Sequence, residues 1–251
     1  MESSSTIKLA CLGTLGFHDS EKGRTACYMI PELGIVFDCG SGLFRVMKNL
    51  RTKEIDIFLS HSHVDHVAGL PVLLEVFEVG HIEKIRFHSE KDILNAAKSL
   101  LERPYFPVHV EIEYIPFEDN KPIELPNGCK VTYFKLNHTD PCYGYRVERS
   151  DISFAYITDT TSNEESEYIK DVVGVKVLAH EMYCNQSQHE IAPHIGHTST
   201  LGLKQFVDKV KPEKVIAIHH NPNGDLESIE KEGHEMIPNL VFAKDNLEID
   251  I

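Results

Sequence analysis

No stretch of this 251-residue chain is long and apolar enough to span a membrane as a helix. Residues 1–6 are polar and acidic, and they lack the basic and apolar regions of a secretory signal peptide. A strand-like segment, residues 7–12, follows directly. We therefore expect a cytoplasmic location and no membrane partner.

Low-complexity segments, internal sequence repeats and Gly/Ser-rich linkers are also absent. Apolar residues make up 41% of the chain, which is enough for a substantial core. Strand-like and helical patterns occur in both halves, so a duplicated β-rich unit is the alternative. The sequence favours a single α/β domain over residues 1–251.

Basic residues are few, because 25 Lys and Arg stand against 39 Asp and Glu, for a formal net charge of −14. A sequence-independent grip on a polyphosphate backbone needs clustered Lys and Arg. We therefore expect no stable complex with nucleic acid.

No Cys-x-x-Cys pair occurs among the six cysteines. Their scattered spacing indicates neither a disulfide framework nor a cysteine-type zinc site. Buried thiols in a reducing compartment are the better interpretation.

Histidine is abundant, and one segment concentrates it: Ile55-Asp-Ile-Phe-Leu-Ser-His61-Ser-His63-Val-Asp65-His66. An apolar, strand-like run ends there in three histidines and one aspartate within six positions. His61 and His63 are two residues apart, so on extended backbone their side chains project to the same side. Imidazole and carboxylate together suit zinc, and other late first-row divalent metals less exclusively. Burial without a metal would leave several polar groups unsatisfied, so this segment predicts a metal site.

The segment after this motif, residues 67–77, has apolar residues at helical spacing, with Pro71 in the first turn. The motif therefore lies between a strand and the N-terminus of a helix. A second helix is expected after Ser89, which offers an N-cap. Asp38, at the end of an earlier strand, either lies near the metals or caps the next helix.

Later strands also end in residues that bind metals. We expect strands over residues 129–136 before His138, 152–157 before Asp159, 175–179 before His180-Glu181, and 215–218 before His219-His220. α/β folds build sites at strand ends from several loops in this way. His197 precedes a helix capped by Thr198 or Ser199, which places it at the positive end of that helix.

The ordered set of His61-x-His63-x-Asp65-His66, an isolated histidine, an Asp-Thr pair after a strand and a final histidine resembles the metallo-β-lactamase fold over nearly the whole chain. Gly-Leu-Pro after the motif, Thr-Asp159-Thr, His180-Glu181 and Gly196-His197-Thr-Ser-Thr are similar to the ribonuclease Z and phosphodiesterase branch of that superfamily. The resemblance implies an αβ/βα four-layer sandwich with the site along one edge of two packed sheets.

The resemblance also implies two divalent metal ions, with Zn2+ expected and Mn2+ as the alternative. It places the first ion on His61, His63 and His138, and the second on Asp65, His66 and His219, with Asp159 bridging the pair. His219 is preferred to His220 because Val-Ile-Ala-Ile-His219 matches the strand-then-ligand phrase of the family. His220 then either supports the ligands or is a structural histidine.

Ribonuclease Z enzymes carry a long protruding arm that grips tRNA, whereas residues 67–137 here are accounted for by helices and strands. The missing arm and the negative charge favour a small anionic nucleotide as substrate. A similar compact form occurs among phosphodiesterases that open cyclic nucleotides, including phage anti-Pycsar proteins, which destroy the cyclic pyrimidine signals of bacterial defence. The resemblance to that group implies hydrolysis of cyclic mononucleotides, a homodimer and, for a phage-encoded protein, the host cytoplasm.

In the mechanism that this resemblance implies, two ions share a hydroxide, because a metal-bound water can have a pKa of about 7. Asp65 binds a metal and orients or deprotonates the nucleophile. His197 donates a proton to the departing ribose oxygen, which is a poor leaving group. His180 and Glu181 position or charge His197. The alternatives are a plain helix-cap histidine for His197 and a satisfied buried pair for His180 and Glu181.

Three other functions remain open. The nearest is a ribonuclease Z-like endonuclease that trims tRNA 3′ ends. The second is the hydrolysis of a lactone or thioester, which the same fold supports elsewhere. The third is a non-enzymatic protein that keeps the metals but sequesters or senses a ligand.

Overall fold

The computed structural model of the protein describes residues 6–79, 82–119 and 121–251. The chain divides into two compact units, and each is built from separate segments. The first unit contains the described residues up to Gly13, Ala26–Glu118 and Lys244–Ile251, and the second contains Thr14–Thr25 and Asp119–Ala243. None of the helices within these described ranges is long and apolar enough to cross a membrane.

The first unit contains a seven-stranded mixed sheet with the strand order β14-β1-β2-β3-β4-β5-β6. The three pairings from β14 to β3 are antiparallel, and the three from β3 to β6 are parallel. Its strands are β1 (Lys8–Gly13), β2 (Cys27–Ile30), β3 (Ile35–Phe37), β4 (Glu54–Phe58), β5 (Lys84–Ser89), β6 (Glu113–Pro116) and β14 (Glu248–Asp250).

The α-helices of the first unit follow β3, β4 and β5, which form its parallel pairings. They are α1 (Val46–Asn49), α2 (Val64–Val67), α3 (Leu73–Val79) and α4 (Lys91–Leu100), with the 3-10 helices η1 (Pro31–Leu33), η2 (Ser41–Arg45) and η3 (Leu70–Val72). The expected N-cap Ser89 is wrong, because Ser89 ends β5 and its hydroxyl donates to the carbonyl of Leu59. Glu90 caps α4 instead, and its carboxylate accepts a hydrogen bond from the amide of Asp92.

The second unit contains another seven-stranded mixed sheet, with the order β13-β12-β11-β10-β9-β8-β7. The pairings from β13 to β10 are parallel and those from β10 to β7 are antiparallel, which is the same mixture as in the first unit. Its strands are β7 (Ile123–Glu124), β8 (Lys130–Lys135), β9 (Tyr143–Arg149), β10 (Ile152–Ile157), β11 (Val177–Glu181), β12 (Lys214–Ile218) and β13 (Leu240–Phe242).

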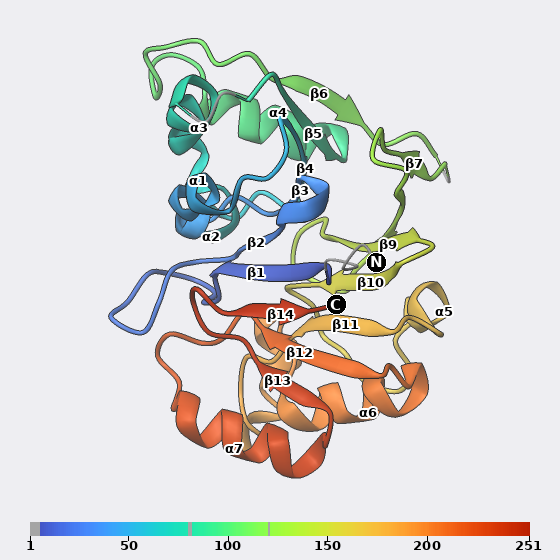
Figure 1. Ribbon diagram of the computed structural model, residues 1–251. Coiled ribbons are helices and arrows are strands. Elements are labelled where there is room, and N and C mark those ends of the chain that lie inside the picture. Colours follow the sequence, from blue (N-terminus) through green and yellow to red (C-terminus); the bar gives the residue numbers. More distant parts are fainter. Residues whose placement is uncertain (1–5, 80–81, 120) are drawn as a thin grey trace. The chain divides into compact units, whose positions relative to one another are not determined.

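Helices of the second unit bury its main apolar cluster. They are α5 (Ile169–Val172), α6 (Thr200–Val210) and α7 (Leu226–Met236), with the 3-10 helices η4 (Gln186–Gln188) and η5 (Ala192–Ile195). Helices α6 and α7 lie side by side against the sheet (Figure 1), and α6 contributes Leu203, Phe206 and Val210 to the cluster. Ser199 caps α6 by accepting a hydrogen bond from the amide of Gly202, which decides between the two expected caps.

Mixed α/β architecture with two sheets confirms the predicted fold class. Strand β10 has the predicted bounds, whereas β11 begins two residues later than the predicted residues 175–179 and extends through His180 and Glu181. The prediction of one domain over residues 1–251 stays a prediction.

Candidate metal centre

The histidine-rich motif of the first unit follows β4 and enters α2. His61 and His66 are fully buried, Asp65 is 8% exposed, and His63 is partly buried. The ring centroid of His61 lies 4.4 Å from that of His63 and 4.2 Å from that of His66. The Asp65 carboxylate reaches Nε2 of His66 at 3.4 Å. The motif therefore brings three imidazoles and one carboxylate together, as its spacing predicts.

Asp38, which lies between β3 and η2, contacts this motif through Ser60 and His66. Its Oδ2 lies 2.8 Å from Nδ1 of His66 and accepts a 2.8 Å hydrogen bond from the Ser60 hydroxyl. Its Oδ1 accepts from the Ser60 amide at 2.7 Å. Of the two roles considered for Asp38, the contact with the motif is the one observed, since η2 has Gly40 at its N-cap and no side-chain cap. Asp38 adopts a φ of +57°, which Asp tolerates better than most residues.

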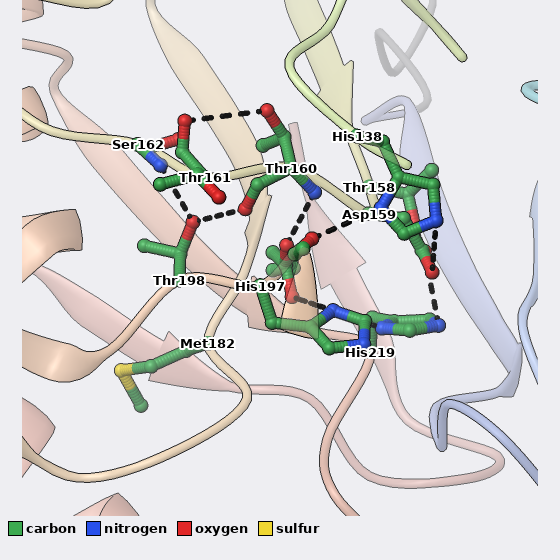
Figure 2. A network of polar contacts seen from close by, with 12 residues as sticks. His138, Thr158, Asp159, Thr160, Thr161, Ser162, Met182, His197, Thr198 and His219 are labelled. Carbon is green, nitrogen blue, oxygen red and sulfur yellow. Dashed lines mark hydrogen bonds and ion pairs between the residues drawn. The ribbon is translucent and has the colours of Figure 1, made fainter. Parts of the chain in front are cut away.

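Three ligands predicted for the second unit lie at the ends of alternate strands of its sheet. His138 follows β8, Asp159 follows β10 and His219 follows β12 directly. Oδ1 of Asp159 lies 3.0 Å from Nε2 of His219, and Oδ2 lies 3.9 Å from Nε2 of His138. Figure 2 shows the three side chains pointing towards one another. Each carboxylate oxygen of Asp159 therefore faces a different histidine.

Two further contacts orient these ligands. Nδ1 of His138 lies 3.0 Å from the Gly196 carbonyl, and the Thr158 hydroxyl donates to Oδ1 of Asp159 at 2.7 Å. Burial lowers the pKa of His138 below its ordinary value, although the charge of Asp159 partly opposes this. A lowered pKa favours the neutral imidazole, which is the form that binds a metal.

His197 and Glu181 form an ion-pair geometry beside His219. Nδ1 of His197 lies 3.0 Å from Oε2 of Glu181, and Nδ1 of His219 lies 3.9 Å from the same oxygen. The other carboxylate oxygen accepts a hydrogen bond from the Thr160 amide. Candidate ligand atoms of Glu181, His197 and His219 all lie within 4.8 Å of one another. Glu181 is therefore fixed by the backbone while it faces both imidazoles.

The ring of Tyr183 stacks on His197, with centroids 3.9 Å apart and planes 11° apart. No motif in the sequence pointed to Tyr183. The alternation of β11, continued beyond Glu181, would have found it, because Tyr183 is two residues further on and contacts His197 as Glu181 does.

His180 lies on the opposite side of β11 from Glu181, as the same alternation requires. Its Nε2 lies 2.7 Å from the Ser162 hydroxyl, and its ring packs 5.0 Å from that of Phe206. Burial lowers the pKa of His180 to about 4. The structure therefore brings Glu181 to His197 but places His180 in the helix-covered core, and a catalytic role for His180 stays a prediction.

His219 and His220 diverge at the end of β12. His219 has a φ of +53° and turns towards Asp159. His220 stacks on Phe242, with centroids 3.7 Å apart, and its Nε2 lies 3.0 Å from the Ala243 carbonyl. These contacts are those of a structural histidine for His220.

The donor chemistry of the predicted ligands fits divalent metal ions. In His61, His66 and His138, Nδ1 is within 3.0 Å of a protein oxygen, which belongs to Ser60, Asp38 and Gly196 respectively. Hydrogen bonds of this kind orient metal-binding imidazoles and set the tautomer in which Nε2 is the ligand atom. Imidazole and carboxylate are ligands that suit zinc. The assignment of individual residues to individual ions stays a prediction.

Comparison with known proteins places this site in a family. A β-lactamase superfamily domain is recognised over residues 34–220, and the chain belongs to that family. A ribonuclease Z of Prochlorococcus marinus strain AS9601 is 26% identical over an alignment of 284 positions, gaps included. The alignment covers 86% of this chain and 89% of that protein. The predicted class, a metal-dependent hydrolase of the phosphodiesterase type in the ribonuclease Z-like branch, is confirmed.

Solved structures show the same fold. The metallo-β-lactamase fold protein YhfI from Bacillus subtilis superimposes with a TM-score of 0.78 at 18% identity, covering 98% of this chain and 99% of that one. The short form of human tRNase Z gives a TM-score of 0.75 at 18% identity, covering 97% of this chain and 99% of that one. The predicted metallo-β-lactamase fold is therefore confirmed.

Proposed function

We propose that this protein is a dinuclear metal phosphodiesterase that hydrolyses cyclic mononucleotides, with zinc as its metal. The observation that carries this proposal is the position of Asp159, whose two carboxylate oxygens face the Nε2 atoms of His219 and His138. A carboxylate in this arrangement is suited to bridging two ions, because it offers one oxygen to each.

In this proposal, seven predicted ligands would hold two divalent ions. His61, His63 and His138 would hold the first ion, Asp65, His66 and His219 would hold the second, and Asp159 would be shared by both. This ligand set is supported by the family to which the chain belongs. It is also supported by the hydrogen bonds at Nδ1 of His66 and His138, which leave Nε2 as the ligand atom.

Bound divalent ions would supply a nucleophilic water near neutral pH and would offset charge on the phosphate. Side chains of the protein then position the nucleophile and move the protons. Asp65 orients the nucleophile and accepts its proton on a carboxylate oxygen. Glu181, fixed by the Thr160 amide, accepts a hydrogen bond from Nδ1–H of His197 and stabilises its imidazolium form. Nε2–H of His197 then donates the proton that the departing ribose oxygen needs.

A small substrate is favoured over a long RNA by charge and by size. The net charge of −14 opposes binding to a polyphosphate backbone. The alignment with the Prochlorococcus ribonuclease Z has 284 positions, but 86% of this 251-residue chain is only about 216 residues. About 68 of the aligned positions therefore have no residue from this chain. A chain without such insertions has less surface with which to hold tRNA.

We extend the proposal to evasion of Pycsar-type defence, a homodimer and a cytoplasmic location.

The second candidate function is tRNA 3′-end cleavage, which the names of the curated relatives favour. Metal-replete protein is incubated with precursor tRNA and, side by side, with cyclic AMP, cyclic CMP and cyclic UMP. Chromatography then detects ring-opened mononucleotides or a shortened tRNA. Cleavage of the tRNA alone would refute the proposal, and stoichiometric binding without product would establish a sequestering protein.

His197→Ala tests the proton donor, with His234→Ala in the exposed face of α7 as the matched control. We expect His197→Ala to lower turnover on a cyclic nucleotide by about 100-fold, the scale of general acid catalysis. Metal content and turnover of bis-p-nitrophenyl phosphate, whose leaving group needs no proton, stay unchanged. An equal loss on both substrates would show that His197 only positions other groups.

A further inference from the structure

One loop of the second unit presents an aromatic side chain in an unusual backbone conformation. Phe17 is 65% exposed and has a φ of +60°. Single exposed apolar residues are common and need no explanation. A bulky aromatic residue at positive φ is not common, because its Cβ is crowded in the left-handed region. The surrounding structure must therefore hold Phe17 in this conformation.

Contacts on both sides of Phe17 hold the loop on the segment that follows β12. The amide of Gly16 donates to the carbonyl of His220 at 2.9 Å. The ammonium group of Lys22 donates to the carbonyls of Pro222 and Gly224, at 2.9 and 2.8 Å. Phe17 is therefore displayed from an anchored loop.

The same loop is seated directly on the predicted metal ligand His219. A Cβ atom at Gly16 would lie 2.3 Å from Cε1 of the His219 ring, so only glycine allows this approach. Phe17 is the next residue, and its Cα is about 3.8 Å from that of Gly16. Phe17 therefore directly follows the residue that packs against the imidazole facing Asp159.

We propose that Phe17 is a stacking platform for the base of the nucleotide substrate. This inference rests on the proposed function and names the group that recognises the base. An apolar ring face carries no charge and attracts any planar base without hydrogen-bond selectivity. The His18 ring lies edge-on to Phe17, with centroids 4.9 Å apart at 61°, and so limits the positions that the Phe17 ring can take.

The test compares full-length, metal-replete Phe17→Ala and Phe17→Trp with Tyr105→Ala, in which an aromatic ring that is 73% exposed is removed from the first unit. Substrates are cyclic AMP, cyclic UMP and the 3′,5′-cyclic phosphate of methyl riboside, which has no base. We expect Phe17→Ala to raise KM for the two nucleotides about 5- to 150-fold, with kcat unchanged, since one base–aromatic stack has this strength. The base-free substrate is unaffected, Phe17→Trp restores KM, and Tyr105→Ala behaves as wild type.

Several outcomes would overturn the inference and leave the proposed function standing. These are an unchanged KM for cyclic AMP, an equal rise in KM for the base-free substrate, and a change of oligomeric state in sedimentation. If the wild-type protein hydrolyses none of the substrates, the proposed function falls. Titration calorimetry with AMP and UMP then decides on Phe17, because an unchanged Kd in Phe17→Ala refutes stacking.

Discussion

Replacing Asp38 with asparagine changes one atom and reverses the hydrogen-bond polarity behind the metal-binding motif. The carboxylate accepts from the Ser60 amide through Oδ1, and through Oδ2 it is paired with the Ser60 hydroxyl and with Nδ1 of His66. In Asp38→Asn the amide oxygen still accepts from the Ser60 amide, so an NH2 group faces His66. Nδ1 must then accept, which moves the proton to Nε2 and removes the lone pair that would bind a metal.

Loss of such a supporting carboxylate typically lowers metal affinity 10- to 100-fold, or by about 1.4 to 2.8 kcal/mol. We expect a value in this range for Asp38→Asn, because the donor and acceptor are fully buried and the Nδ1–Oδ2 separation is 2.8 Å. Asparagine also tolerates the φ of +57° at this position, so the variant keeps its backbone. The measurement is zinc affinity at pH 7 by competition with a colorimetric chelator, with metal content by mass spectrometry.

Asp245→Asn is the matched control in the same unit. Its carboxylate is 10% exposed and pairs with Arg45 at 2.6 Å, so the change costs a similar buried interaction without touching a histidine. We expect Asp245→Asn to lose stability and to keep wild-type zinc affinity. A folded Asp38→Asn protein with wild-type zinc affinity would refute the tautomer argument.

Three further predictions concern Gly16, Asp56 and Lys211. Gly16→Ala forces a Cβ to within 2.3 Å of the His219 ring; we expect lower zinc content and a loss of about 1 to 3 kcal/mol, measured by mass spectrometry and thermal unfolding. Burial raises the pKa of Asp56, but hydrogen bonds, led by that from Arg86, outweigh it and leave the pKa below its ordinary value. Asp56→Asn then costs about 3 kcal/mol at pH 7 in urea unfolding, and the difference from wild type shrinks as pH falls below the ordinary carboxyl pKa of about 4 towards the lower folded value. Lys211→Gly relieves the φ of +54° at the end of α6 and stabilises by about 1 kcal/mol; a loss instead would show that the side chain contributes contacts.

Local patterns predicted a large part of the site. The spacing of the motif places the rings of His63 and His66 within 4.4 Å of the ring of His61, because short separations leave the chain little freedom. Strand ends were also predictable, since each apolar run stops where Asp159 or His219 follows. The roles of His180 and Glu181 were not separated, although strand alternation puts them on opposite sides.

Longer-range contacts were not predictable in this way. Asp38 had two possible roles, and its contact with His66 joins residues that are 28 positions apart. The contact of His138 with the Gly196 carbonyl spans 58 positions. Neither partner can be found from spacing, because sheet pairing and loop conformation decide which segments meet.

The sequence by itself determined the residue types of the site and the elements that carry them. Histidines and carboxylates at the ends of apolar strands define a metal-binding chemistry before any fold is known. Tertiary structure alone decided which nitrogen of each imidazole is held by the protein, which ring His220 packs against, and where Phe17 is displayed. The physical reason is that residue type and strand alternation are local properties, whereas hydrogen-bond partners and positive φ angles are imposed by distant segments.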